Sequence, residues 1–331
     1  MKGLIYTIIS ILLVASVIAI LLTYLNISYS LRKDTAEKII SDQLHYFTKN
    51  VEEDIERALK ISAKRALVAI VDNVTLEGKP LDKKTAIGNI SELIQYGTLK
   101  GSRNDIMFNN TLSYWIEEIN KKANQTFKFN LTTGEVEIKP FDSFNILFSI
   151  NFTINISDNT EKIRIYRNGR KEILVSIEGL EDPLMPLNTE GRYRKTIRKC
   201  PFNNHVEFLG GDPSDPSNYN LDNLLNDSYE GYFHVSEDGA SFLDRLEGSL
   251  KASDFYKNMA QNPIGLESFV NIERIRFLGL TEFENRPVID YLYFDSSWGV
   301  LVSCINGTPS WLKLDDQNAI KYGVENLLIP C

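Results

Sequence analysis

The sequence is poor in the residues that build metal centres and disulfide scaffolds. Its 331 residues include three cysteines and three histidines. The histidines His45, His205 and His234 stand far apart, with no cysteine or carboxylate at the spacing of a common metal motif. A phosphate-binding loop, a dinucleotide fingerprint, a nucleophile elbow and a His-Glu-x-x-His motif are all absent. We therefore predict no catalytic residues, no metal site and no cofactor, and hence a protein that is not an enzyme.

An excess of positive charge is also missing, since the net charge is −8. This balance argues against nucleic acid as a partner and against binding to an anionic membrane surface. A basic run between Arg192 and Lys199 and an oxygen-rich loop from Asp212 to Asp222 are the local exceptions. The simpler interpretation is a solvated face for the first and a solvated loop for the second. Binding of a cation by the loop stays open, although the loop lacks EF-hand spacing.

Glycine and proline are absent between Gly3 and Gly78, which removes the strongest helix breakers from a long stretch. Within it, Leu4 to Leu25 has no charged residue and, at 22 residues, is long enough to cross a bilayer core of about 30 Å. The run is longer than a cleaved secretory signal, and its small residues lie in its middle. We therefore expect residues 1–30 to be an uncleaved transmembrane anchor held in membrane lipid.

An amphipathic stretch follows the anchor. Positions that are apolar, apart from the small polar Ser62, recur at steps of three or four, the spacing of one helix face: Ile40, Leu44, Phe47, Val51, Ile55, Leu59, Ser62, Ala66 and Ile70. The pattern predicts one nearly continuous helix from Leu4 to about Val71, whose outer part is covered by a globular domain. The alternative is a pair of helices with a break near Asn26–Ser30.

The apolar period changes from helical to alternating after about residue 126. Two hairpins are predicted, one over Phe127–Ile138 turning at Thr133-Gly134 and one over Ile163–Ile177 turning at Asn168-Gly169. A strand over Phe144–Ile156 lies between them. We predict an antiparallel sheet of about four or five strands that packs on the long helix, forming an α+β domain over residues 31–180.

A second α+β domain is predicted over residues 181–331, after the boundary at Asp182-Pro183. Its expected elements are a basic helix, three strands and a terminal helix, over Gly191–Lys199, Gly231–Val235, Val288–Phe294, Gly299–Ser303 and Leu314–Leu328.

Asparagine sequons decide on which side of the membrane these domains lie. The flanking charges, Lys2 against Arg32 and Lys33, are close to a tie under the positive-inside rule. The motif Asn-x-Ser/Thr is more frequent than composition predicts, which indicates a glycosylated, extracytoplasmic surface, although chance matches in an Asn-rich chain are the alternative. The sequons are Asn26, at the end of the anchor, and Asn73, Asn89, Asn109, Asn124, Asn130, Asn151, Asn155, Asn226 and Asn306.

An odd number of cysteines, Cys200, Cys304 and Cys331, suggests one disulfide and one free or intermolecular thiol. The pairings Cys200–Cys304 and Cys304–Cys331 are the first to test. The alternative is that all three are reduced and buried.

The N-terminal third resembles type IV pilins and their minor-pilin relatives. Lys2-Gly3 before the apolar run, the long helix and the following sheet carry the resemblance. It implies processing after Gly3, which would free Leu4, and assembly with other pilin-like subunits through the N-terminal helix. Major pilins usually carry Glu where this chain has Ile8, so the resemblance implies a minor or tip-type subunit, or a simple membrane-anchored relative.

The C-terminal half resembles uncharacterised archaeal cell-surface proteins. The segments that carry this resemblance are Ser241–Gly248, Gly265–Val270 and Val288–Phe294. The resemblance implies location at the cell surface more than activity, and a glycan-rich surface fits an archaeal origin.

These observations favour a glycosylated, single-pass cell-surface protein that acts by adhesion or by protein–protein binding, with a surface glycan or another cell-surface protein as the partner. A membrane-anchored ectoenzyme or ligand-binding domain is the alternative. It would show a polar pocket with paired carboxylates, for instance around Asp290 and Asp295.

Overall fold

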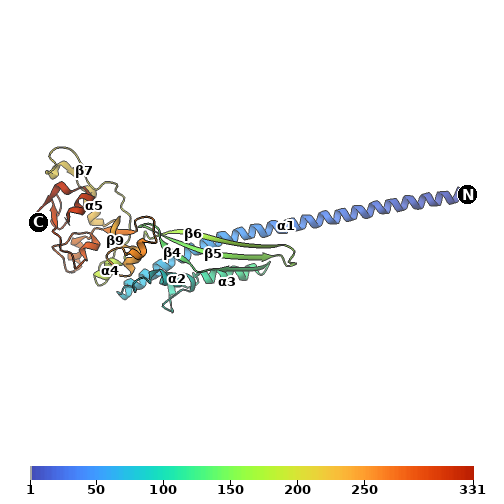
Figure 1. Ribbon diagram of the computed structural model, residues 1–331, viewed down its shortest axis with the longest axis horizontal. Helices are drawn as coiled ribbons and strands as arrows, with labels where there is room; N and C mark the ends of the chain where they lie inside the picture. The colour runs from blue at the N-terminus through green and yellow to red at the C-terminus, as the bar shows by residue number, and fades with distance from the viewer. Residues whose placement is uncertain (1) are drawn as a thin grey trace. The chain divides into compact units, whose positions relative to one another are not determined.

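The computed structural model describes residues 2–331, and describes their side chains from residue 11 onward. The chain is α+β, with one long apolar helix and several small antiparallel sheets (Figure 1). It divides into two compact units. The first contains the chain up to Ile55 with Ile116–Thr133 and Phe152–Gly169, and the second contains Glu56–Trp115, Gly134–Asn151 and Arg170–Cys331.

Helix α1 is a single element from Lys2 to Glu77, drawn in blue in Figure 1. The prediction of one continuous helix is confirmed, and no break occurs near Asn26–Ser30. The helix ends where Gly78 adopts a left-handed conformation, with φ of 61°. The predicted processing site, Gly3 and Leu4, lies in the first turns of α1, and its side chains lie outside the described residues.

The apolar side chains of the first described part of α1, from Ile11 to Leu31, are exposed. Ile11 and Leu31 are each more than 60% exposed, and none of the most apolar stretch of this helix is buried. By length and composition, α1 is the one helix in the described chain that is long and apolar enough to cross a membrane.

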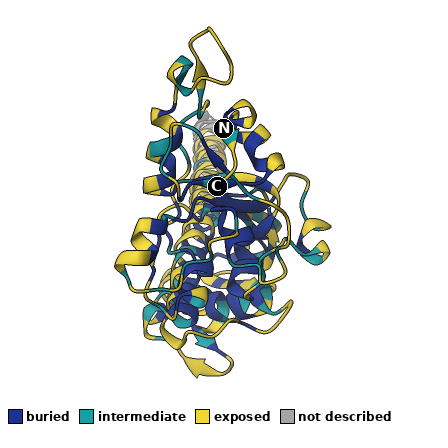
Figure 2. Cartoon of the chain, turned by 90° about the vertical axis from the view of Figure 1, so that its left-hand side faces the viewer, coloured by how far each residue is buried: buried dark blue, intermediate teal, exposed yellow. Residues whose placement is uncertain are grey.

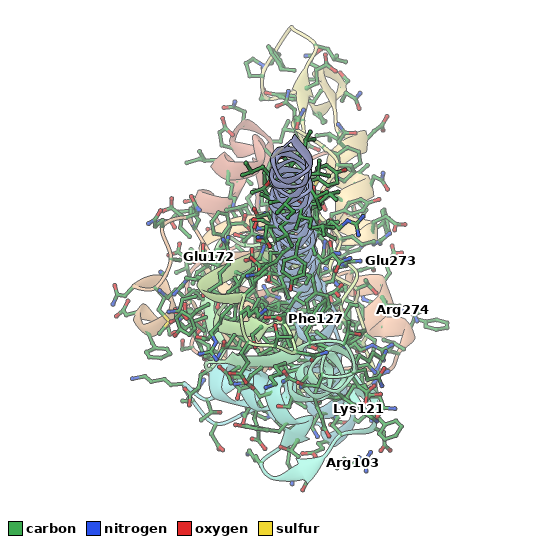
Figure 3. All side chains as sticks on the ribbon, turned by 90° about the vertical axis from the view of Figure 1, so that its right-hand side faces the viewer. Arg103, Lys121, Phe127, Glu172, Glu273 and Arg274 are labelled. Atoms are coloured by element: carbon green, nitrogen blue, oxygen red, sulfur yellow. A yellow bond between two sulfur atoms is a disulfide. The ribbon has the colours of Figure 1, made fainter. Side chains whose placement is uncertain are left out.

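In the first unit, the predicted apolar face of α1 is buried at Leu44, Val51 and Ile55. Phe47 of α1 contacts the rings of Phe127, labelled in Figure 3, and Phe129, with ring centroids 5.4 and 5.5 Å apart. Helix α3 (Leu112–Ala123) is tied to strand β3 (Lys128–Thr133) by the side chain of Asn120. That amide donates to the Leu131 carbonyl at 3.0 Å and accepts from the Leu131 N–H at 2.8 Å.

The largest sheet has four strands, and its pairing differs from the two predicted hairpins. Strands β3 and β4 (Glu137–Pro140) pair with β5 (Asn145–Ser157) rather than with each other, both antiparallel to it. Gly134 does not turn the chain back but donates its N–H to the Asn151 carbonyl at 2.9 Å. The first predicted hairpin is therefore wrong, although its two strands exist.

The second predicted hairpin is wrong because β6 (Arg164–Ser176) runs straight through Asn168-Gly169 and pairs with β5. A type I′ turn requires positive φ at both central residues, and neither residue has it. Gly169 serves close packing instead, since a Cβ there would lie 2.3 Å from Cζ of Phe152. The Asn-Gly pair marks a ring-packing position and not a turn.

The second unit is made of short elements (Figure 2 colours them by burial). The unit also contains α1 from Glu56 onward, β4 and parts of α3, β5 and β6. Its other elements are α2 (Ala86–Tyr96), β1 (Thr98–Leu99), β2 (Ser102–Arg103), η1 (Asp105–Met107), α4 (Leu184–Asn188), β7 (Glu207–Phe208), η2 (Pro216–Asn218), β8 (Tyr219–Asn220), α5 (Asp222–Glu230), β9 (Phe233–Ser241), α6 (Phe242–Leu246), α7 (Asp254–Lys257), β10 (Gly265–Ser268), α8 (Ile272–Phe277), α9 (Asp290–Tyr293), β11 (Ser303–Ile305), β12 (Lys313–Leu314), α10 (Asp316–Tyr322), η3 (Glu325–Leu327) and β13 (Leu328–Ile329).

Four predictions for this unit are wrong. Gly299–Ser303 is not a strand, since only its last residue, Ser303, belongs to one, β11. Gly191–Lys199 is extended rather than helical, because its backbone bridges to Glu181 and to Phe233. The predicted strand Val288–Phe294 contains helix α9. The predicted terminal helix stops after Tyr322, where Gly323 takes φ of 73° and caps α10.

Candidate metal centre

Four side chains with metal-ligating atoms meet in the second unit: Cys200, His205, Asp227 and His234. One ligand atom from each lies within 4.8 Å of all the others. Nε2 of His234 lies 2.7 Å and Nε2 of His205 lies 3.1 Å from the same Oδ2 of Asp227. Sγ of Cys200 lies 3.9 Å from Nε2 of His205. The arrangement combines one thiol, two imidazoles and one carboxylate, the ligand types that zinc and related ions bind.

The fold brings Asp227 and His234 together through a helix end. Helix α5 stops at Gly231, which takes φ of 62° and donates its N–H to the Asp227 carbonyl at 2.6 Å. The chain then reverses into β9, whose second residue is His234. A Cβ at position 231 would lie 2.6 Å from Nζ of Lys195 and 3.0 Å from the carbonyl oxygen of Phe269, so glycine meets both a conformational and a steric requirement.

Backbone hydrogen bonds hold the other two members of the cluster, Cys200 and His205, against β9 and α5. The N–H of Cys200 donates to the carbonyl of Phe233 at 3.0 Å, next to His234 on β9. The carbonyl of His205 accepts from the N–H of Leu224 on α5 at 3.1 Å. The backbone around Cys200 and His205 is thus tied to the strand and the helix that carry the two remaining ligand atoms.

Asp227 is the buried centre of the cluster, with no exposed side-chain surface. Its Oδ1 is buried without a hydrogen-bond partner, while Oδ2 accepts from both imidazoles. Burial acts to raise the pKa of this carboxyl, but the hydrogen bonds from His205 and His234 outweigh it and hold the pKa below its usual range. The carboxylate is therefore ionised and only half satisfied.

Cys200 is half-buried and forms no disulfide. Burial raises the pKa of its thiol to about 11, so without a cation nearby it carries a proton at neutral pH. The N–H of Phe202 points at Sγ at 3.4 Å, a contact that favours the thiolate.

An aromatic wall encloses the imidazoles. The ring of Tyr322 on α10 meets His205 edge to face at a centroid distance of 4.9 Å and His234 at 5.7 Å. Phe269 packs on Tyr322 at 4.7 Å. The Tyr322 hydroxyl donates to Oε1 of buried Glu267 at 2.7 Å, and burial raises its pKa well above the usual range. Both imidazoles are thus held by neighbours that are themselves fixed.

A second buried polar group in this unit centres on Arg245 of α6, which has no exposed surface. Its Nη1 lies 3.1 Å from Oδ2 of Asp182 and 3.0 Å from Oδ2 of Asp290. The Nε atom donates to the carbonyl of Ala240, and Ser268 donates its hydroxyl to Oδ2 of Asp290 at 2.7 Å. Burial raises the pKa of Asp182 in spite of the guanidinium beside it. All these charges have partners, which indicates a structural network.

Lys195 lies beside this network and is almost fully buried. Its ammonium donates to the carbonyl of Phe269 at 3.0 Å and lies 4.7 Å from the ring centroid of Phe233. The guanidinium of Arg245 also lies near this ring, at 5.6 Å. Burial lowers the pKa of Lys195 to about 8, even though Asp290 and Asp182 act in the opposite direction.

The carboxylates considered for an enzyme site do not form a pair with each other in the structure. Asp290 is bound by Arg245 and Ser268. Asp295 accepts from the N–H and hydroxyl of Ser297 and lies 3.6 Å from Nζ of Lys251. Each has its own structural partners.

Of the predicted disulfides, the structure contains Cys304–Cys331, which joins β11 to the segment after β13. Cys200 takes no part in it. The predicted glycosylation sites differ in access: Asn89 is buried, Asn73 and Asn306 are half-buried, and the exposed ones are Asn26, Asn109, Asn124, Asn130, Asn151, Asn155 and Asn226.

Sequence reasoning missed the four-residue cluster because its members belong to two distant pairs, Cys200-x4-His205 and Asp227-x6-His234. Neither spacing is that of a zinc motif. A Cys or Asp within seven residues of His205 and of His234 was the available signal, but it does not single these two out, because His45 has Asp42 equally near. Nothing local indicated that the fold would join the two pairs.

Comparison with protein-family models, with curated proteins and with solved structures finds no match to this chain.

Proposed function

We propose that this protein is a pilin-like, membrane-anchored subunit of the cell surface, with the domains after residue 30 outside the cytoplasm, and that it acts by binding. The observation that carries the proposal is helix α1. One unbroken helix joins an apolar segment whose described side chains, from residue 11 onward, are exposed to a segment whose apolar face is buried at Leu44, Val51 and Ile55. A pilin-like helix has this division, since its first part lies in lipid or against neighbouring helices.

The rest of the proposed architecture follows from the same division. The outer part of α1 packs on the antiparallel sheet to form a pilin-like domain, and residues 181–331 form a second α+β domain that contacts the partner. Short elements, small irregular sheets and loops dominate the second domain, which suits variable surface recognition. The partner is another pilin-like subunit along α1, and a surface glycan or a cell-surface protein at the second domain.

Cross-linking in native membranes tests the assembly. A photoreactive residue in place of Thr23, which is exposed on the apolar part of α1, is expected to yield adducts with other pilin-like subunits. The matched control is the same residue in place of Lys121, labelled in Figure 3 and exposed on α3. Adducts at Thr23 with lipid alone, or recovery of an isolated monomer, would contradict assembly through the helix.

Glycopeptide mass spectrometry on the same membranes tests the orientation. Asn130 and Asn155 are exposed cross-strand partners in β3 and β5, so we expect glycans on both. Asn89 is 8% exposed and its Nδ2 donates to Thr85 at 3.2 Å, so we expect it to be unmodified. Complete recovery of the exposed sequons without glycan would argue against an extracytoplasmic, glycosylated surface.

A membrane-anchored ectoenzyme or ligand-binding domain is the second candidate, and the residues that favour it are Lys195, with its pKa of about 8, and the cluster around Asp227. Turnover of a peptide, sugar or phosphate ester by the full-length protein, lost in Lys195→Met, would favour this alternative.

A further inference from the structure

We propose that Cys200, His205, Asp227 and His234 bind one divalent transition-metal ion of the zinc type. The ion would act as a structural centre that ties the segment 200–205 to α5 and β9. The proposal is independent of the anchor helix and of the side of the membrane on which the domain lies.

The cluster has the size that one tetrahedral ion requires. Bond lengths of about 2.0–2.3 Å place two ligands of one zinc ion roughly 3.3–3.7 Å apart. The imidazole Nε2 atoms lie 2.7 and 3.1 Å from Oδ2 of Asp227, and the sulfur of Cys200 lies 3.9 Å from Nε2 of His205. Displacements of less than about 1 Å would bring the four side chains to these spacings.

The free atoms of the cluster are those that a cation would satisfy. Asp227 has a fully buried carboxyl group whose Oδ1 has no hydrogen-bond partner, and such an atom is costly to leave unpaired. Both imidazoles direct Nε2, a common ligating atom of histidine, to Oδ2 of Asp227, so three atoms of ligating type lie together. A hydrogen-bonded histidine–aspartate group without an ion would leave Oδ1 of Asp227 unsatisfied and would give the Cys200 thiol no role.

The ligand set indicates the class of ion. A thiolate is a soft ligand and imidazole suits zinc, copper, iron and nickel, whereas calcium and magnesium prefer oxygen alone. Four protein ligands would complete a tetrahedral zinc site and leave no position for a reacting water. The expected role is therefore structural.

The surroundings also fit a metal centre. The N–H of Phe202 points at the sulfur of Cys200, as outer hydrogen bonds to metal thiolates do, and the ring of Tyr322 fixes both imidazoles. His205 and His234 keep 14% and 11% of their side-chain surface exposed, which leaves a route from solvent for the ion.

The test uses the full-length protein in detergent micelles, stripped of metal by a chelator, with thiol titration confirming that Cys200 is reduced. Cobalt(II) is the probe, because a thiolate-bound cobalt ion shows a sulfur-to-metal charge-transfer band. We expect one cobalt ion per chain, displaced by zinc. In Cys200→Ser the charge-transfer band should disappear, and in Asp227→Asn affinity should fall at least about 100-fold.

Two controls separate this centre from incidental binding and from misfolding. His45→Ala removes the exposed histidine of α1, which is not one of the four proposed ligands, and should leave cobalt binding unchanged. Zinc should raise the melting temperature of the wild type and of His45→Ala but not that of Asp227→Asn, with each metal-free variant checked by near-UV circular dichroism. Absence of stoichiometric cobalt binding by the wild type, or a charge-transfer band that persists in Cys200→Ser, would overturn the proposal.

Discussion

Residues up to 180 and residues 181–331 bury their cores in two different ways. In the first region, the buried positions are mainly apolar side chains that recur with the period of a helix or a strand, as at Leu44, Val51 and Ile154. In the second, short elements surround buried charges, among them Arg245, with Asp290 as one of its partners. The first core thus follows a regular apolar period, whereas the second combines an apolar cluster with a buried group of paired charges.

The largest effect expected from this comparison is at Arg245. Replacing it with Met leaves Asp182 and Asp290 buried without their cation, which should lower the free energy of unfolding by about 3–5 kcal/mol. Urea titration of the full-length protein in micelles measures it. Arg276→Met, which breaks the surface pair with Glu282, is the control and should cost about 0–1 kcal/mol.

A triple variant sharpens the same point. Asp182→Leu, Arg245→Met and Asp290→Leu together remove all three charges, so no buried ion is left unpaired. Such replacements are often neutral or stabilising. We expect the triple variant to recover most of the stability lost in Arg245→Met, and a triple variant as unstable as the single one would mean that packing, not charge, dominates here.

The next effect lies in the apolar region, on the buried face of α1. Leu44→Ala removes a fully buried side chain and should destabilise the protein by about 2–5 kcal/mol, measured by the same titration. Ile39→Ala is the matched control on the exposed face, where 53% of the side chain is accessible, and should change stability by less than about 0.5 kcal/mol. Equal effects at the two positions would show that this face of α1 does not carry the core.

The smallest effect is a pH dependence that belongs to the charged core. Lys195 has a folded-state pKa of about 8, below that of an exposed lysine, so between those values the unfolded chain binds more protons. Stability from this residue therefore rises as pH increases from about 8 to 10.5, by about 1–3 kcal/mol. The free energy of unfolding is measured against pH for the wild type and for Lys195→Met, and the difference between the two curves isolates the contribution of Lys195. A difference that does not change with pH would contradict the lowered pKa.

The comparison also explains what could be predicted from the sequence. Helix α1 was predicted because its apolar period runs unbroken by glycine or proline, and its predicted face is buried at Leu44 and Ile55. Strand β5 was predicted from its alternation. The Asn168-Gly169 turn was not found, since close packing of Gly169 on a ring leaves the same sequence mark as a turn.

The second region resisted prediction because its order comes from contacts distant in sequence. The bridge between Lys199 and Phe233 turns a basic segment with helical composition into extended chain. The cluster at Asp227 depends on the reversal at Gly231 and on a backbone bond from Cys200 to the neighbouring strand. Such contacts leave no periodic pattern in the sequence, so the candidate metal centre could be recognised only in the three-dimensional structure.

The order of synthesis gives α1 a further consequence. The chain is made from its amino end, so the buried face of α1 is complete before β3, β5 and β6, which lie more than 50 residues later, have been translated. At roughly 5–20 residues per second, α1 waits for several seconds with Leu44, Val51 and Ile55 uncovered. During that interval this uncovered apolar face of α1 is able to bind other apolar surfaces. We expect a chaperone or the apolar face of a neighbouring helix to cover these residues until the strands have been made.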